Sequence, residues 1–170
     1  MKKLALTDFA KYRYPSALEL SPDGRYLTFA LKEVDREGDG YRWNLWLYDL
    51  ESRESRQITR GDHQRQAVWE DNTHILYKTT ELDEAMRARG FEEEWTVYHR
   101  LNVCTGEECE AFRLPMSVSG LWKMDEGRYV FTGETHLDRP NLLELAGEAR
   151  EGEIARRLRA GEPVGSMHDI

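Results

Sequence analysis

The sequence predicts an all-β chain, a partial β-propeller of about three four-stranded antiparallel blades. Two observations predict it: a turn-and-strand pattern recurs along the chain, and the strands are apolar almost throughout. The acidic residues of the recurring turns, Asp23, Asp71 and Asp125, lie 48 and 54 residues apart. These spacings are close to the repeat length of propeller blades, about 40 to 50 residues.

The first turn lies in "SPDGRYLTFA", residues 21–30. Pro22 fixes φ at the first central position of a turn, Asp23 suits the second, and Gly24 adopts the left-handed conformation that closes it. After Arg25, the residues of "YLTFAL" (26–31) are aromatic, β-branched or apolar, as in a short strand. Before the turn, "SALEL" (16–20) alternates like an incoming strand. The acidic residue is therefore interpreted as a turn former.

The same pattern returns twice. In "AVWEDNTHILYKT" (67–79), an apolar strand is followed by a turn at Asp71-Asn72 and a second strand. In "SGLWKMDEGRYVFTG" (119–133), the turn is Asp125-Glu126-Gly127. Trp69 and Trp122 stand just before equivalent turns, a recurrence that favours packing between blades over stacking on a ligand.

The second half of each unit also repeats. "NLWLYDLESRESRQIT" (44–59) is a strand, a polar turn and a short strand, and "TVYHRLNVCTGEECEAFRLP" (96–115) has the same layout. "NLLELAGEAREGEIARRL" (141–158) repeats it less cleanly, since its Ala, Glu and Arg content also suits a short helix. Runs such as "LWLYDL" need not alternate, because both faces of a blade are covered by its neighbours.

Long connections are expected between the second and third strands of each unit, at 32–42, 81–94 and 134–140. The second connection is predicted to contain a helical turn around Leu82, Ala85 and Met86. The predicted organisation is one domain: a lead-in (1–16), blade 1 (17–60), blade 2 (61–116), blade 3 (117–158) and a flexible tail or link to a further blade (159–170).

Composition limits the partners. The chain of 170 residues carries 24 Lys and Arg against 32 Asp and Glu, a net charge of −8. An acidic surface repels a phosphate backbone, so nucleic-acid binding is not expected. No apolar run approaches the roughly 18 residues of a membrane span, and the N-terminus has no signal-peptide core. The sequence therefore predicts a cytoplasmic protein that does not contact a membrane.

Few residues suggest chemistry, and no metal or other cofactor is expected. Cys104 and Cys109 are interpreted as reduced thiols flanking a hairpin turn, with a disulfide between them as the alternative. The histidines are not paired at ligand spacing, and His74 and His99 fit cross-strand packing positions. The turn aspartates lack the spacing of a calcium loop.

The stretches "SPDGRYLTFAL", "NLWLYDLESRESRQIT" and "DFAKYRYPSALELSPDG" resemble the start of the β-propeller domain of prolyl-oligopeptidase-family serine peptidases. The closest branch is that of the acylaminoacyl-peptidase and dipeptidyl-aminopeptidase-like enzymes, and the resemblance covers about residues 8–158. It implies a non-catalytic propeller that gates the access of peptide substrates to a C-terminal α/β-hydrolase domain. No serine here has the G-x-S-x-G context of that domain's nucleophile, so no catalytic residue is expected in this chain. The alternative is a free-standing TolB-like or WD-repeat module that binds a protein partner.

The resemblance also raises one binding hypothesis. Dipeptidyl peptidases of this family hold the free amino group of a substrate with a pair of propeller glutamates. Glu93 and Glu94, beside Trp95, have the chemistry for that role. The alternative is a solvated charged loop.

Three blades also have a packing problem. Each blade buries its faces against neighbours, so blades 1 and 3 would each expose one apolar flank. Covering that surface is favourable by roughly 25 cal/mol per Å². The isolated chain is therefore expected to self-associate, for example as a dimer of two three-blade halves.

Overall fold

A computed structural model describes residues 11–35, 38–88, 94–125, 127–134 and 140–160. The chain divides into two compact units. The first comprises Met1–Thr79 and Tyr98–Ala111, and the second comprises Thr80–Val97 and Phe112–Ile170. The boundary crosses three strands of the second sheet, so each unit is described by itself.

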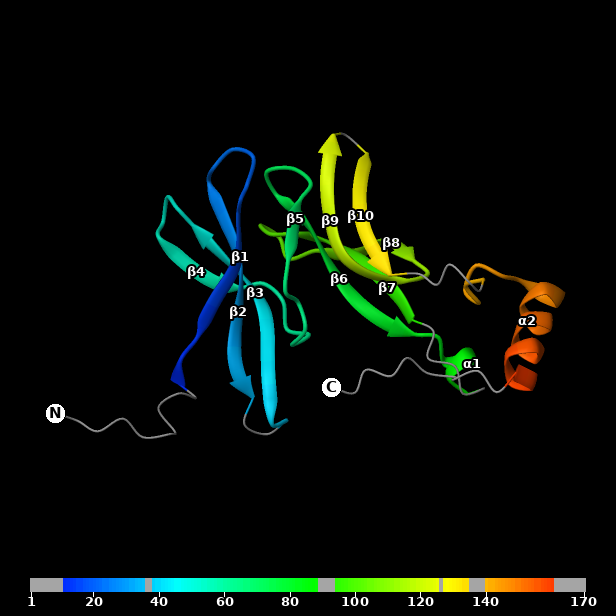
Figure 1. The fold of residues 1–170 in the computed structure, drawn as a ribbon. Helices are drawn as coiled ribbons and strands as arrows, with labels where there is room; N and C mark the ends of the chain where they lie inside the picture. Colours follow the sequence, from blue (N-terminus) through cyan, green and yellow to red (C-terminus); the bar gives the residue numbers. More distant parts are fainter. Residues whose placement is uncertain (1–10, 36–37, 89–93, 126, 135–139, 161–170) are drawn as a thin grey trace. The chain divides into compact units, whose positions relative to one another are not determined.

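The first sheet is a four-stranded antiparallel meander. Its strands are β1 (Tyr14–Leu20), β2 (Tyr26–Asp35), β3 (Gly40–Asp49) and β4 (Glu54–Gln57). They lie in the order β1-β2-β3-β4, so that each strand pairs with the next one along the chain (Figure 1). The expected strand, polar turn and short strand of residues 44–59 are confirmed by β3 and β4.

The turn between β1 and β2 is held by side chains of the "SPDG" motif. The backbone N–H of Gly24 donates to the carbonyl of Ser21 at 2.8 Å. The Ser21 hydroxyl donates to Oδ1 of Asp23 at 2.6 Å, and that oxygen also accepts the N–H of Arg25 at 3.1 Å. Gly24 has φ +72°, a conformation that glycine adopts without strain. The role of Pro22, Asp23 and Gly24 is therefore a structural one within this turn.

The expected long connection at 32–42 is wrong, because β2 runs to Asp35 and β3 begins at Gly40. Cross-strand pairs extend the hairpin: Lys32 lies opposite Trp43, and Val34 lies opposite Tyr41. The Lys32 ammonium lies 3.7 Å from the centroid of the Tyr41 ring. Such pairs stabilise a ladder that a polar sequence would otherwise leave as a loop.

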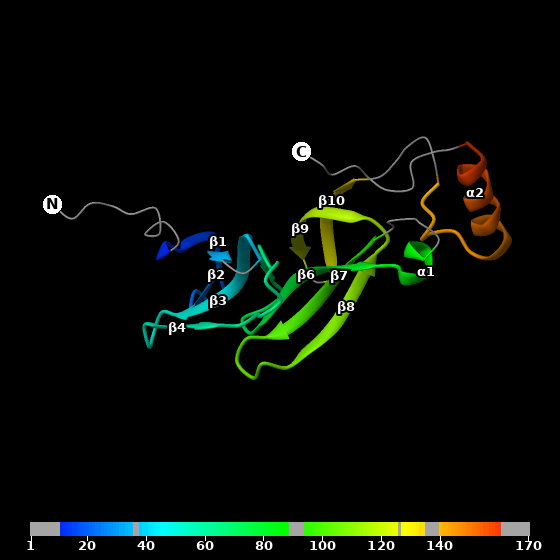
Figure 2. The ribbon, with the colours of Figure 1, turned by 90° about the horizontal axis from the view of Figure 1, so that it is seen from below.

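The second sheet is also four-stranded, in the order β5-β6-β7-β8. Its strands are β5 (Ala67–Trp69), β6 (His74–Leu82), β7 (Glu94–Asn102) and β8 (Glu108–Leu114). Figure 2 shows β6, β7 and β8 side by side. The helical turn expected after β6 is confirmed as α1 (Glu84–Arg87), where the Asp83 carboxylate caps the N–H of Met86.

The core of the first unit lies between strands of the first and second sheets. The first sheet contributes Ala30, Leu45 and Leu47, and the second contributes residues such as Ile75 and Leu101. Leu45 and Ile75 are fully buried. Apolar side chains from two successive sheets thus form one cluster, as expected where blades pack face to face.

The third sheet has two strands among the described residues, β9 (Ser117–Asp125) and β10 (Arg128–Glu134). A further strand pair was expected within 141–158, with a short helix as the other possibility. The structure has the helix, α2 (Gly147–Ala160). Ala, Glu and Arg favour helix, and i,i+3 and i,i+4 pairs between Glu153 and Arg156 or Arg157 support it.

Helix α2 packs through a small apolar cluster of the second unit. Ile154 is buried with Leu142, Leu143 and Met86, the last from α1. Arg157 is 4% exposed and donates to Glu153 and to the carbonyl of Pro140. Neither helix of the described residues is long and apolar enough to cross a membrane.

The two tryptophans at equivalent turns differ in burial. Trp69 is 6% exposed and belongs to the core of the first unit, as predicted. Trp122 is 49% exposed, so its expected burial is wrong. Its ring covers Gly120 on the same strand, since a Cβ at that glycine would clash with the ring. Val130, which lies opposite Trp122 in the ladder with β10, is also exposed, at 48%.

Candidate functional site

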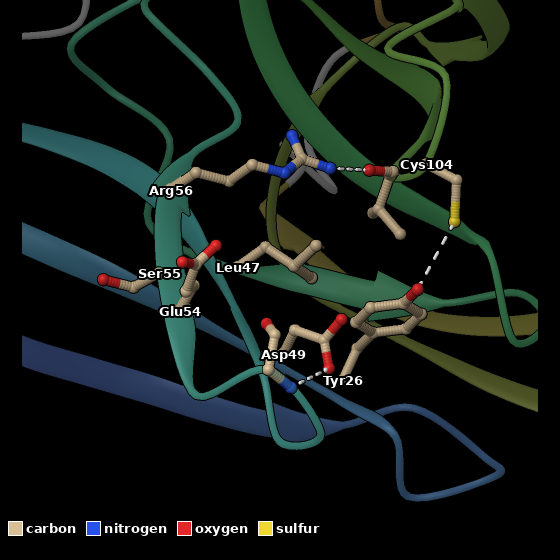
Figure 3. A pocket seen from close by; sticks show the side chains of 9 residues that line it. Tyr26, Leu47, Asp49, Glu54, Ser55, Arg56 and Cys104 are labelled. Atoms are coloured by element: carbon tan, nitrogen blue, oxygen red, sulfur yellow. Dashed lines mark hydrogen bonds between the residues drawn. The ribbon is translucent and has the colours of Figure 1, made fainter.

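The first unit contains a polar pocket of about 290 Å³ (Figure 3). The start of β2 supplies Tyr26, and the turn after β7 supplies Val103 and Cys104. Strands β3 and β4 with their turn supply the rest of the lining: Leu47, Asp49, Ser52, Glu54, Ser55 and Arg56. The pocket therefore lies where the first sheet meets the turn between β7 and β8.

Two side-chain contacts close this pocket. The Arg56 guanidinium donates to the backbone carbonyl of Val103. The Cys104 thiol donates to the Tyr26 hydroxyl across 3.8 Å, and this contact raises the pKa of the Tyr26 phenol. The backbone of Cys104 is held in the turn because its N–H donates to Oδ1 of Asn102 at 2.9 Å. These contacts tie β4 and β2 to the β7–β8 turn.

One acidic group of the pocket, the Asp49 carboxylate, is hydrogen bonded to the turn that follows β3. The Asp49 carboxylate accepts the N–H of Glu51 at 2.9 Å and of Ser52 at 3.3 Å. These donors, the Glu51 N–H first, hold the pKa of Asp49 below its usual value. A carboxylate held ionised in this way is a weak base. The contact recorded for the Cys104 thiol within the described residues is the Tyr26 hydroxyl.

Both cysteines are free, exposed thiols in the structure. Cys104 lies in the turn after β7, and Cys109 lies within β8, so the two do flank the hairpin connection. The sequence interpretation of two reduced thiols matches this arrangement.

A second polar cluster crosses β6, β7 and β8. Nε2 of His99 lies 3.0 Å from the Thr79 hydroxyl, and Nδ1 lies 3.3 Å from Glu108. The Tyr77 hydroxyl donates to the same Glu108 oxygen at 2.6 Å, and its ring stacks on His99 with centroids 5.4 Å apart. Burial, then the Glu108 carboxylate, raises the pKa of Tyr77.

The order hydroxyl, imidazole, carboxylate is that of a catalytic triad. These three side chains, however, project from neighbouring strands of a regular β-sheet. Thr79 lies within a strand rather than on an exposed elbow, and the Glu108 oxygen is shared with Tyr77. Backbone N–H groups within a sheet are engaged in the ladder, so they form no oxyanion hole. We interpret these residues as a cross-strand polar cluster, the packing role predicted for His99.

His74 has a comparable local role. Its Nδ1 lies 2.9 Å from Asp71, and its Nε2 lies 3.1 Å from the Asn102 amide. Partial burial opposes ionisation of Asp71, but the N–H groups of Thr73 and His74 outweigh it and lower the Asp71 pKa to about 2. Asp71 and Asn72 lie in the bend between β5 and β6, where Asp71 organises the turn.

The remaining turn residues lie at the third sheet. Asp125 ends β9 and forms an ion pair with Arg128, and Gly127 has φ +74°. The Arg128 hydrogen bond lowers the pKa of Asp125. Within the described part of the chain, no group of three or more His, Cys, Asp or Glu side chains could hold a metal ion.

Only one residue of the predicted amine-binding pair lies among the described residues. Glu94 is the first residue of β7 and is half-buried, whereas Glu93 lies outside the described residues. The neighbouring Trp95 packs on the α2 cluster and lies 5.8 Å from the Arg113 guanidinium. The amine-binding role of Glu93 and Glu94 therefore stays a prediction.

Comparison with known proteins identifies the fold. The β-propeller domain of the Trilobed protease from Pyrococcus furiosus, whose topology is described as open velcro, is 14% identical with a TM-score of 0.52. That match covers 72% of this chain and 34% of that one. Acylaminoacyl peptidase from Pyrococcus horikoshii is 15% identical with a TM-score of 0.54, and the match covers 74% of this chain and 18% of that one.

Both neighbours are prolyl-oligopeptidase-family proteins. The chain thus spans about a third or less of the length of either structure. No family model and no curated protein matches the sequence. At such low identity the similarity identifies architecture only: the chain is an all-β protein with the fold of a partial β-propeller, as the sequence predicted.

Proposed function

We propose that the chain is a non-catalytic β-propeller segment of a prolyl-oligopeptidase-like serine peptidase. The segment gates access of peptide substrates and supports a C-terminal α/β-hydrolase domain. The observation that carries the proposal is the shared propeller fold over nearly three quarters of the chain in two peptidases. The sequence motifs "SPDGRYLTFAL" and "NLWLYDLESRESRQIT" support it independently.

Gating by a propeller is a steric function, so it needs no reactive side chain in this segment. It needs rigid blades, and the shared core of the first and second sheets, with Leu45 and Ile75 fully buried, supplies rigidity in the first unit. The polar clusters around Cys104 and His99 are consistent with this role, since their hydrogen bonds join neighbouring strands and turns.

The gene itself provides the first test. Sequencing beyond the codon for Ile170 is expected to reveal an in-frame α/β-hydrolase sequence with a G-x-S-x-G elbow. A stop codon directly after Ile170, with no such frame nearby, would favour the free-standing interaction module instead.

Gating itself requires a second experiment on the longer peptidase. The rate of hydrolysis is measured for a series of peptides of increasing length. This rate should fall steeply once the peptide is too large to pass the propeller. Equal rates for a dipeptide derivative and a long polypeptide would refute gating while leaving the domain assignment intact.

A further inference from the structure

Strand β10 presents an open edge. It pairs with β9 on one side, and no other described strand lies along its second side (Figure 1). Every residue of β10 except Tyr129 is exposed. Val130 and Phe131 are 48% and 41% exposed. An exposed apolar edge of this kind is a template for pairing with another strand.

The open edge is also regular. The pairing of β9 with β10 skips Met124 and Ser119, so both bulge residues belong to β9. Strand β10 has no inserted residue between Arg128 and Glu134. Because bulges are what usually protect an edge from pairing, their location on the other strand leaves β10 able to extend a ladder.

The sequence of β10, "RYVFTGE", is complementary to itself in the antiparallel direction. When two copies of the strand are aligned with Phe131 opposite Phe131, Arg128 of each copy lies opposite Glu134 of the other. Val130 then lies opposite Thr132. Opposite charges and aromatic pairs directly across an antiparallel ladder are the pairs that stabilise it.

We propose that two copies of this chain pair β10 with β10, antiparallel and centred on Phe131, to form one four-stranded sheet. The order β9-β10-β10-β9 has the same number of strands as the two sheets described above. The two-fold contact is isologous and closes, so it gives a dimer and not a filament. Pairing seven residues adds about six to eight backbone hydrogen bonds.

The same arrangement enlarges the apolar face around Trp122. Val130 lies directly opposite Trp122 in the β9–β10 ladder, so both side chains share one face of the sheet. In the dimer, Trp122 and Val130 of both copies lie on the same face of the joined sheet. This pairing makes specific the self-association expected of the isolated chain, and it is tested on that chain independently of the proposed function.

Charge reversal tests the register. Light scattering coupled to size exclusion is measured over a concentration series for wild type, Arg128→Glu, Glu134→Arg and the double variant. Each dimer contains two Arg–Glu pairs, so each single reversal should weaken dimerisation about tenfold or more. The double reversal should recover most of the wild-type affinity between the two copies. Glu134→Arg is the cleaner single variant, because Arg128 also pairs with Asp125 in its own chain.

Cross-linking tests the central contact. In a background of Cys104→Ser and Cys109→Ser, Phe131→Cys should be joined to a second copy rapidly by a short bis-maleimide. Leu158→Cys, at an exposed position of α2, is the matched control and should react slowly. Circular dichroism checks that each variant is folded.

The proposal is overturned by a wild-type chain that stays monomeric at about 100 µM, where weak complexes form. It is equally overturned by a dimer that withstands both single reversals, or in which position 131 cross-links no faster than position 158.

Discussion

Replacement of Leu45 by alanine tests the packing of the first unit. Leu45 lies in β3, is fully buried, and belongs to the cluster that joins the first and second sheets. Its backbone N–H donates to the buried Thr59 hydroxyl at 2.8 Å. That bond does not involve the side chain, so the substitution changes packing and leaves the backbone contact in place.

The magnitude follows from the atoms removed. Leucine to alanine deletes three carbon groups, each contributing about 0.8 kcal/mol when buried, or about 2.4 kcal/mol together. A residual cavity raises the cost, so the free energy of unfolding should fall by about 3 to 4 kcal/mol. Because domains are stable by only about 5 to 15 kcal/mol, the variant should lose a large part of its stability.

Urea denaturation followed by circular dichroism, at one fixed protein concentration, measures the loss. Leu50→Ala is the matched control, because Leu50 is 44% exposed in the turn after β3 and should cost less than about 1 kcal/mol. Combining Leu45→Ala with Ile75→Ala should give a coupling energy of at least about 0.5 kcal/mol, because both side chains belong to one buried cluster and their removal leaves a shared cavity. Equal effects of Leu45→Ala and Leu50→Ala, or strict additivity with Ile75→Ala, would refute face-to-face packing of the two sheets.

Two further outcomes follow from the structure, and a third tests the amine-binding role that the family resemblance implies. Gly24→Ala should destabilise the chain by about 1 kcal/mol because φ is +72°, whereas Gly152→Ala in α2 should stabilise it by up to about 1 kcal/mol; equal urea midpoints for the two variants would contradict this. The Asp71 pKa of about 2 lies below its ordinary value of 3.8, so its contribution to stability is present above about pH 4 and is lost as the pH falls towards 2. Asp71→Asn should flatten that part of the urea-midpoint profile between pH 5 and pH 2.5, and an unchanged slope would refute the assignment. Finally, replacing Glu93 and Glu94 by glutamine in the longer peptidase should reduce its preference for free over acetylated N-termini, and unchanged preference would remove the amine-binding role.

Local signals made most of the blade strands predictable. The "SPDG" turn is encoded by residues that contact each other within five positions, as when Ser21 and Asp23 hydrogen bond. The strand pairs of 44–59 and 96–115 and the helical turn near Met86 were equally local. Each depends on backbone preference and short-range side-chain contacts, which a sequence pattern records directly.

Features that depend on pairing between distant residues were not predictable. The extension of β2 and β3 through 32–42 requires cross-strand contacts such as Lys32 with Tyr41. The cluster of Thr79, His99 and Glu108 requires the register of three strands, although a histidine inside a strand pattern was a partial signal. Trp122 was predicted to be buried because its position repeats that of Trp69, but burial also needs a neighbouring surface.

The most direct measurement for the central claim is the mass of the polypeptide that carries this segment in its native cell. An antibody raised against the purified chain should recognise a polypeptide well above 19.9 kDa that a fluorophosphonate probe also labels, while the purified chain itself stays unlabelled. That result is predicted for the propeller portion of a serine peptidase. A single unlabelled polypeptide of 19.9 kDa would contradict the account.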